Sequence, residues 1–191
     1  PWQWLDGRVY STMMSSGILN LDEVKVVARQ QKRILSLFRG WSKDGKGMLG
    51  FDVHGYPYGL LQHDLTREFL LFYYANMAHI HSRGNWTALE LANADGTQET
   101  PFCPPAQMTI PLNTKWLLVF EDPQEPILWL ARGTPRNWLE DGEVIEVTGA
   151  PTRWGKIGFK LETEINQSKI KWTIQLPPKI SNVQIKINLR P

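Results

Sequence analysis

One stretch decides the first half of the chain: residues 64–82 read DLTREFLLFYYANMAHIHS. Its apolar side chains recur at helical spacing, and from Phe69 to Tyr74 they would cover most of a helix's circumference. The sequence therefore predicts a helix over residues 64–82, with Asp64 as its N-cap and Gly84 as its stop. We expect neighbouring elements to bury this helix on several sides.

A second helix is predicted nearer the start of the chain. Asn20 and Glu23 have the spacing of a capping pair, in which each side chain binds the other residue's amide. Apolar residues then recur at helical spacing as far as Phe38, and Gly40 follows as a stop signal.

A third helix is predicted to begin after the prolines at 104–105 and to reach Phe120, with Pro111 kinking or splitting it. The connections between these helices, residues 39–62 and 83–104, are long and contain many turn-forming residues. Long connections between long helices favour a larger helical array whose loops build a binding site.

Beyond residue 122 apolar residues alternate with polar ones, which indicates strands with one solvent-exposed face and one buried face. The sequence thus predicts an α+β chain of two parts: helices over residues 1–122, and a small antiparallel β-sheet or sandwich over residues 123–191. The predicted strands lie at 127–131, 143–147, 157–161, 170–176 and 183–189, with a turn at 166–168.

Composition excludes several classes of function. A formal net charge of +2 in 191 residues gives no broad basic field, so we expect no nucleic-acid partner. No apolar run reaches the length of a membrane span, and the single cysteine, Cys103, excludes an intrachain disulfide. Nine tryptophans provide flat rings suited to packing or to stacking on ligands such as sugars.

Four segments resemble a known family. Residues 81–90 (HSRGNWTALE), 102–107 (FCPPAQ) and 116–122 (WLLVFED) look like the last hairpins of bacterial six-hairpin glycosidases. Residues 128–159, with LWLAR, WLEDG and APTRWG, resemble the β-module that follows the helical ring in those proteins.

The resemblance implies an (α/α) toroid, here partial, with catalytic carboxylates in loops at one mouth. The rest of the toroid would come from an upstream chain or another fragment. The chain opens with Pro-Trp-Gln-Trp rather than Met, so we expect a fragment or a processed product. Catalysis by this portion alone is not expected. The location would be periplasmic or extracellular if the resemblance holds, and is otherwise open.

Helix geometry divides the candidate site residues into two groups. A helix over residues 64–82 is about 28 Å long, so loops at its two ends are expected not to touch one sugar. Glycoside hydrolysis uses two carboxyl groups roughly 5–9.5 Å apart. At one mouth the catalytic candidates are Glu90, Glu99 and Asp6, with Asp95 as a further acid, Trp86 as a stacking platform, Arg83 as a clamp for a sugar carboxylate, and Trp4 as a second aromatic; the opposite end offers His54, Tyr56 and Tyr58.

Two other functions are compatible with the sequence. A non-catalytic carbohydrate-binding or domain-support module would use Trp86, Trp138 or Trp154, whereas a polysaccharide lyase would need a Tyr or His base from residues 54–63. The histidine spacings favour no metal site, and no phosphate-binding glycine loop occurs, so we predict no cofactor. In each case the expected partner is a carbohydrate.

Overall fold

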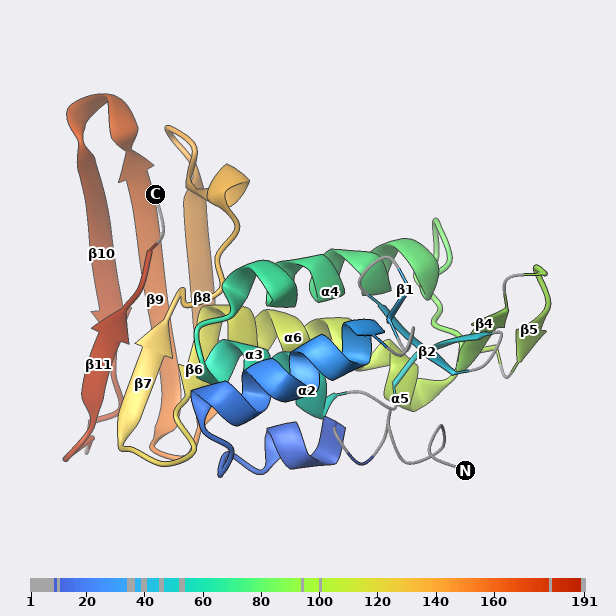
Figure 1. Cartoon of the computed structure of the whole chain (residues 1–191). Coiled ribbons are helices and arrows are strands. Elements are labelled where there is room, and N and C mark those ends of the chain that lie inside the picture. The colour runs from blue at the N-terminus through green and yellow to red at the C-terminus, as the bar shows by residue number, and fades with distance from the viewer. Residues whose placement is uncertain are drawn as a thin grey trace. The chain divides into compact units, whose positions relative to one another are not determined.

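The chain forms two compact units, Pro1–Thr114 and Lys115–Pro191, with the boundary inside helix α6 (Figure 1). Its described residues are mixed α+β, with helices α2 to α6 and three small sheets, none closed into a barrel. Within that part, no helix is both long and apolar enough to cross a membrane. The computed structural model describes residues 9, 11–33, 37–38, 41–44, 47–51, 54–93, 95–99, 101–178 and 180–189.

Helix α2 spans Leu21–Arg33 and confirms the predicted capping pair. The Glu23 amide donates to Asn20 Oδ1 at 3.0 Å, and the Asn20 amide donates to the Glu23 carboxylate at 2.8 Å. These bonds satisfy N–H groups that lack partners within the helix. The predicted continuation to Phe38 is wrong, because Leu37–Phe38 forms strand β1, which pairs with β2 (Trp41–Asp44).

Helix α3 spans Gly55–Gln62, where the sequence indicated a turn-rich loop. The two glycines Gly55 and Gly59 allow a close helix contact here and do not form a turn. A Cβ on Gly55 would lie 1.7 Å from the Ser11 carbonyl oxygen, and one on Gly59 would lie 2.8 Å from Met14 Cβ. Their spacing of four places both glycines on one helix face, against the helical segment that holds Ser11 and Met14.

Helix α4 spans Thr66–His79, shorter at both ends than the predicted 64–82. Asp64 has a φ of 64° and lies in the turn before the helix, so its predicted role as N-cap is wrong. The connection from α3 is so short that the two helices form a hairpin (Figure 1). The chain therefore enters α3 at the end of the hairpin where α4 finishes.

Contacts in this hairpin bury one side of α4. The Tyr56 ring of α3 lies 5.4 Å from the Phe72 ring of α4, and both side chains are buried. Leu71 and Tyr74, on another side, are 53% and 40% exposed. The Tyr73 hydroxyl lies 2.8 Å from Thr114 Oγ1 of α6, so α4 also has a neighbour besides α3. The expected burial on several sides is therefore present in part, and among the described residues one face of α4 stays exposed.

A five-stranded sheet, ordered β1-β2-β3-β4-β5, joins the end of a predicted helix to segments that the sequence indicated were loops. Strand β3 (Gly47–Leu49) pairs antiparallel with β4 (Leu91–Asn93), and β4 pairs with β5 (Gln98–Glu99). The connections 39–62 and 83–104 thus meet in one sheet, and their predicted separation at opposite ends of a helix is wrong.

The predicted third helix is split in two, but not at Pro111. Helix α5 spans Pro104–Gln107 and α6 spans Thr109–Leu118, with the break at Met108. Pro111 lies in the first turn of α6, where a missing N–H leaves no helical bond unmade.

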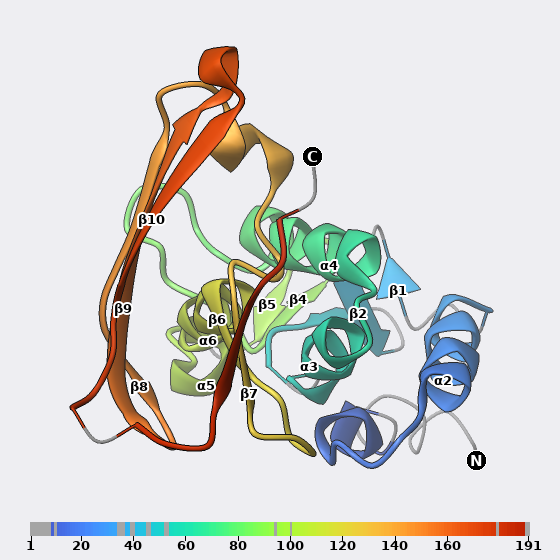
Figure 2. The same cartoon turned by 90° about the vertical axis from the view of Figure 1, so that its left-hand side faces the viewer.

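Two three-stranded sheets make up the second unit, ordered β10-β9-β8 and β11-β7-β6. The predicted antiparallel pairing holds for β8, β9 and β10, which form one long sheet (Figure 2). It is wrong for β11, which pairs parallel with β7, because a long connection lets the returning strand run in either direction. The elements are β6 (Val119–Glu121), β7 (Ile127–Leu130), η1 (Arg136–Leu139), β8 (Val144–Thr152), β9 (Gly155–Glu164), η2 (Ile165–Gln167), β10 (Lys169–Gln175) and β11 (Gln184–Ile187).

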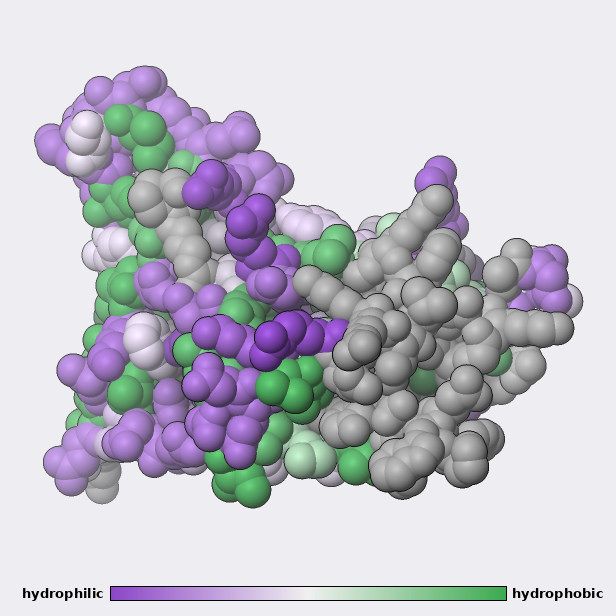
Figure 3. Space-filling model, in the orientation of Figure 1, coloured by the Kyte–Doolittle hydropathy of each residue, from purple (hydrophilic) through white to green (hydrophobic). Residues whose placement is uncertain are grey.

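Side chains from both sheets share one hydrophobic core, which makes this unit a small sandwich. The predicted turn between β9 and β10 is present as η2 followed by Ser168 at φ 53°. Mainly hydrophilic residues surround that turn (Figure 3). The buried core consists of Val119, Leu128, Leu130, Leu139, Ile145, Ile157, Phe159 and Leu161.

Candidate functional site

Residues 80–89 form a small hairpin after α4, here called the 80–89 hairpin. The Ser82 amide donates to the Thr87 carbonyl at 2.8 Å, and the Leu89 amide donates to the Ile80 carbonyl at 3.2 Å. The Ser82 hydroxyl also contacts the Asn85 and Thr87 side chains, at 2.6 and 2.7 Å. These bonds fix the hairpin tip that carries Arg83 and Trp86.

Helix α5 and the residue before it form hydrogen bonds to the main chain of the hairpin. The Gln107 side-chain amide donates to the Trp86 carbonyl at 2.6 Å, while Gln107 Oε1 accepts the Ala88 amide at 2.9 Å. The Cys103 amide donates to the Ala88 carbonyl at 3.0 Å. Ala88 is fully buried, so both of its main-chain groups are satisfied by the 103–107 segment.

Trp86 has an exposed indole on a constrained backbone. Its side chain is 51% exposed and its φ is 55°, a region that costs a large L-residue about 1–2 kcal/mol. The imidazole of His81 lies 6.0 Å from the indole, at an interplanar angle of 54°. Backbone and ring are therefore both held, although half of the side chain faces solvent.

His81 supports that ring from a buried position. Burial lowers the pKa of the His81 imidazole, and the nearby Asn76 carbonyl opposes the shift in part. His81 is therefore mainly neutral at neutral pH, which suits an apolar contact with the indole.

Glu90 lies at the foot of the 80–89 hairpin, immediately before β4. Its side chain is half-buried, and its carbonyl accepts the Gly50 amide at 2.7 Å. The other two acid candidates are less well placed. The backbone of Glu99 pairs with Leu91 in the same sheet, its side chain lying outside the described part, and Asp6 lies outside the described residues, as does Trp4.

His54 belongs to the same end of the first unit. Thr109 Oγ1 lies 3.0 Å from the Gly50 carbonyl and 2.9 Å from His54 Nε2. The Thr109 hydroxyl has one proton, so when it donates to the Gly50 carbonyl it can accept a hydrogen bond from the Nε2-protonated tautomer of His54. The Gly50 segment thus connects His54 to Glu90, which the sequence had assigned to opposite mouths.

The two tyrosines are placed differently from the prediction. Tyr56 is 4% exposed, and its burial, together with the charge of Glu68, raises the pKa of its phenol well above the usual value. It packs in the core with Phe72, which argues against contact with a ligand. Tyr58 is half-buried within α3 rather than displayed on a loop.

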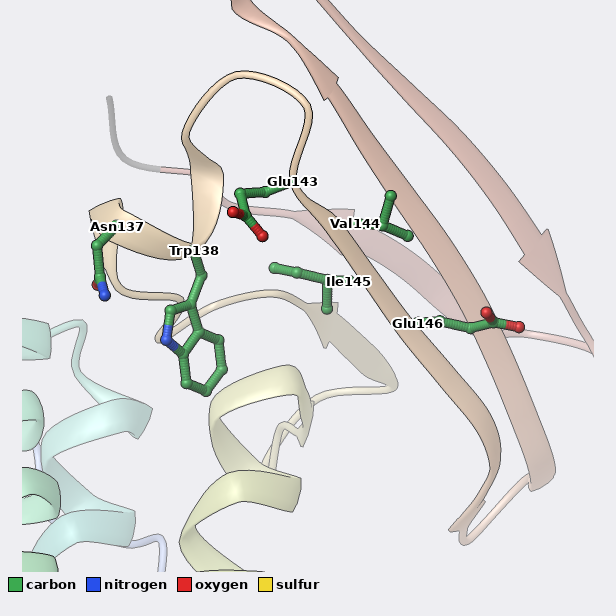
Figure 4. A pocket seen from close by; sticks show the side chains of 6 residues that line it. All are labelled: Asn137, Trp138, Glu143, Val144, Ile145 and Glu146. Atoms are coloured by element: carbon green, nitrogen blue, oxygen red, sulfur yellow. The ribbon is translucent and has the colours of Figure 1, made fainter.

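A separate shallow pocket of about 330 Å³ lies in the second unit (Figure 4). Glu143 and Ile145 point toward the Trp138 indole, whereas Val144 and Glu146 point to the other side of β8 (Figure 4). Trp138 packs partly on the hydrophobic core, so its ring has a structural role irrespective of any ligand.

Among the described residues, no three His, Cys, Asp or Glu side chains come together in a way that could hold a metal ion. Comparison with family models, curated proteins and solved structures gives no match for this chain. Gln107, which contacts Trp86 across 21 positions, was missed as a site residue because no local pattern indicates such a contact.

Proposed function

We propose that this chain is part of a carbohydrate-active enzyme, a glycoside hydrolase, and that the 80–89 hairpin binds its sugar. The observation that carries the proposal is Trp86: an exposed indole with a strained backbone, held by Gln107 and by His81. Strain of this kind accumulates at functional sites, and a flat apolar ring matches the apolar face of a sugar.

Glu90 is the proposed acid/base residue. It follows the hairpin directly, and the Gly50 amide fixes its main chain. Arg83, exposed at the hairpin tip, would hold a sugar carboxylate or hydroxyl, and Glu99 or Asp6 would supply the second carboxyl group.

The wider architecture that we propose is an α/α toroid, in which further helices complete the array. The helical hairpin α3–α4 and the exposed Leu71 and Tyr74 on α4 support this proposal. Catalysis would then require the complete protein.

A second candidate is a non-catalytic carbohydrate-binding module, because the Trp86 geometry alone requires no carboxylate. A polysaccharide lyase is less well supported. Of residues 54–63, which were expected to supply its Tyr or His base, 55–62 form α3, and Tyr56 is buried.

The test compares Glu90→Gln with Trp86→Ala in the intact protein, after a carbohydrate array of plant, bacterial and host glycans has identified a ligand. Trp86→Ala should weaken binding by about tenfold or more, the loss expected for an aromatic contact. Glu90→Gln should retain binding but lower kcat/KM by roughly two decades or more.

Each outcome separates the candidates. Unchanged turnover in Glu90→Gln, with binding lost in Trp86→Ala, favours the binding module. Absence of binding to every glycan on the array, or unchanged binding in Trp86→Ala, overturns the proposed function.

A further inference from the structure

A second exposed aromatic residue lies beside the 80–89 hairpin. Phe102 is 68% exposed and has a φ of 64°. Prolines at 101, 104 and 105 fix φ on both sides of it, so the loop that displays the ring has little conformational freedom. This ring is presented to solvent by a stiff backbone.

Phe102 and Trp86 are connected through Ala88. The residue after Phe102 donates its amide to the Ala88 carbonyl at 3.0 Å, and Trp86 lies two positions before Ala88. At strand-like spacings these links keep the Cα atoms of the two aromatic residues no more than roughly 16 Å apart, a span of about three sugar units.

The backbone at both positions is unusual for the residue type. Six described residues other than glycine have positive φ: Asp64, Trp86, Phe102, Ala131, Ser168 and Asn182. Of these, Trp86 and Phe102 alone have large aromatic side chains, and both are exposed. Asp and Asn adopt this conformation more readily, whereas a bulky residue in it is an outlier. Packing does not compensate for the strain at Phe102, because most of its ring is in solvent.

We propose that Phe102 is a second sugar-stacking platform, and that the ligand is an oligosaccharide or polysaccharide segment reaching from Trp86 to Phe102. The inference rests on the proposed carbohydrate function and adds the class of substrate, a chain of several sugar units rather than a monosaccharide. Two exposed rings on constrained backbone suit such a chain, whose units present apolar faces and polar edges in turn. Because the backbone is constrained at both positions before binding, little main-chain freedom is lost on association.

The experiment measures affinity against chain length in the intact protein. The probes are the monosaccharide and the di- to hexasaccharides of the glycan that the array selects. Wild-type affinity should rise between the monosaccharide and the trisaccharide. Phe102→Gly should lower affinity for the trisaccharide and longer chains by about tenfold and leave the monosaccharide unchanged. Phe102→Trp keeps a flat ring at this position, so it should retain the wild-type affinity for longer chains that Phe102→Gly loses.

Thermal unfolding distinguishes a binding role from a structural one. Glycine adopts positive φ without strain, so Phe102→Gly should keep or raise the melting temperature, whereas loss of a structural contact would lower it. Met108, 58% exposed and next to Gln107, provides the matched control. Met108→Ala should leave sugar affinity unchanged, because a flexible thioether is no stacking platform.

Failure of the second platform can be distinguished from failure of the proposed function. Lost binding in Trp86→Ala with wild-type chain-length dependence in Phe102→Gly overturns the second platform and leaves the proposed function standing. A lower melting temperature in Phe102→Gly also overturns it. If the array shows no ligand, and Phe102→Gly and Met108→Ala both abolish self-association in size-exclusion chromatography, the aromatic surface is a protein interface and both proposals fail.

Discussion

The Gly50 amide donates a 2.7 Å hydrogen bond to the Glu90 carbonyl, which ties the end of β3 to the foot of the 80–89 hairpin. A Cβ on Gly50 would lie 2.1 Å from the Leu89 carbonyl oxygen and 2.8 Å from Ala106 Cβ. Only glycine permits this approach, so the position of Glu90 depends on a residue 40 positions earlier.

Gly50→Ala should therefore disrupt the junction. We expect the free energy of unfolding to fall by about 1–3 kcal/mol, the usual cost of overpacking, and sugar affinity to fall with it. Gly84→Ala is the control, because a Cβ there meets nothing within 4 Å and only the backbone at φ 95° is strained. Urea denaturation of both variants gives the comparison. A loss at Gly50 no larger than that at Gly84 would contradict the steric argument.

Gln107 should control the Trp86 backbone. In Gln107→Ala the buried Ala88 amide loses its acceptor, which should cost about 1–3 kcal/mol and speed hydrogen exchange at that amide. Gln107→Glu keeps the acceptor but places a carboxylate against the Trp86 carbonyl, so it should weaken sugar binding while the Ala88 amide stays protected. Exchange measured by NMR separates the two effects, with the exposed Gln167→Ala as control. Slow exchange at Ala88 in Gln107→Ala would show that this contact does not matter.

Features specified by neighbouring residues were predicted correctly from the sequence. The Asn20–Glu23 pair and the alternation over 157–176 give a helix start and a β-hairpin, since their partners lie nearby in the chain. Gly55 and Gly59 misled the prediction, because their close packing against Ser11 and Met14 depends on a distant segment. The pairing of β3 with β4 has no local signal at all.

The same division holds for the candidate site. Trp86, Arg83 and Glu90 were selected by residue type, and their closeness in space follows from their closeness in the sequence, whereas the hairpin itself was not predicted. The hydrogen bond from Gln107 to Trp86 arises from a tertiary contact. So does the position of His54 at the same end of the first unit as Glu90. Phe102 did carry a local signal, the flanking prolines, but its positive φ is a property of the folded backbone.

The Asn20 cap should be a measurable part of stability. Replacing it by Ala removes the acceptor for the Glu23 amide and should lower the free energy of unfolding by about 1 kcal/mol. Asn20→Asp retains an oxygen acceptor at the same place, and should stay near the wild-type value. Equal denaturation midpoints for the Ala and Asp variants would indicate that the end of α2 is frayed in solution.

Stability should fall on mild acidification because of His81. Its folded pKa is lowered by burial, so below about pH 6.5 the unfolded chain takes up a proton that the folded chain resists. The contribution is thus fully present above pH 6.5 and is lost as the pH falls toward the folded pKa. Urea midpoints between pH 7 and 5 should drop less in His81→Gln than in wild type. An NMR titration of His81 at or above the ordinary value would refute this assignment.

Asp95, at the turn between β4 and β5, should behave oppositely to a catalytic acid. The Thr97 hydroxyl donates to its carboxylate at 2.6 Å and the Thr97 amide at 2.9 Å, and these bonds lower the pKa of Asp95. Its stabilising effect is present above about pH 3.9 and is lost as the pH falls through the lowered folded pKa. Thr97→Val removes the hydroxyl donor and keeps the amide, so the carboxyl titration followed by NMR should move part of the way back up.

A group held ionised at neutral pH has no proton to give a leaving group. With Glu99 or Asp6 as the second carboxyl group, Asp95→Asn should leave turnover unchanged where Glu90→Gln lowers it, and an equal loss in both variants would place Asp95 in the reaction.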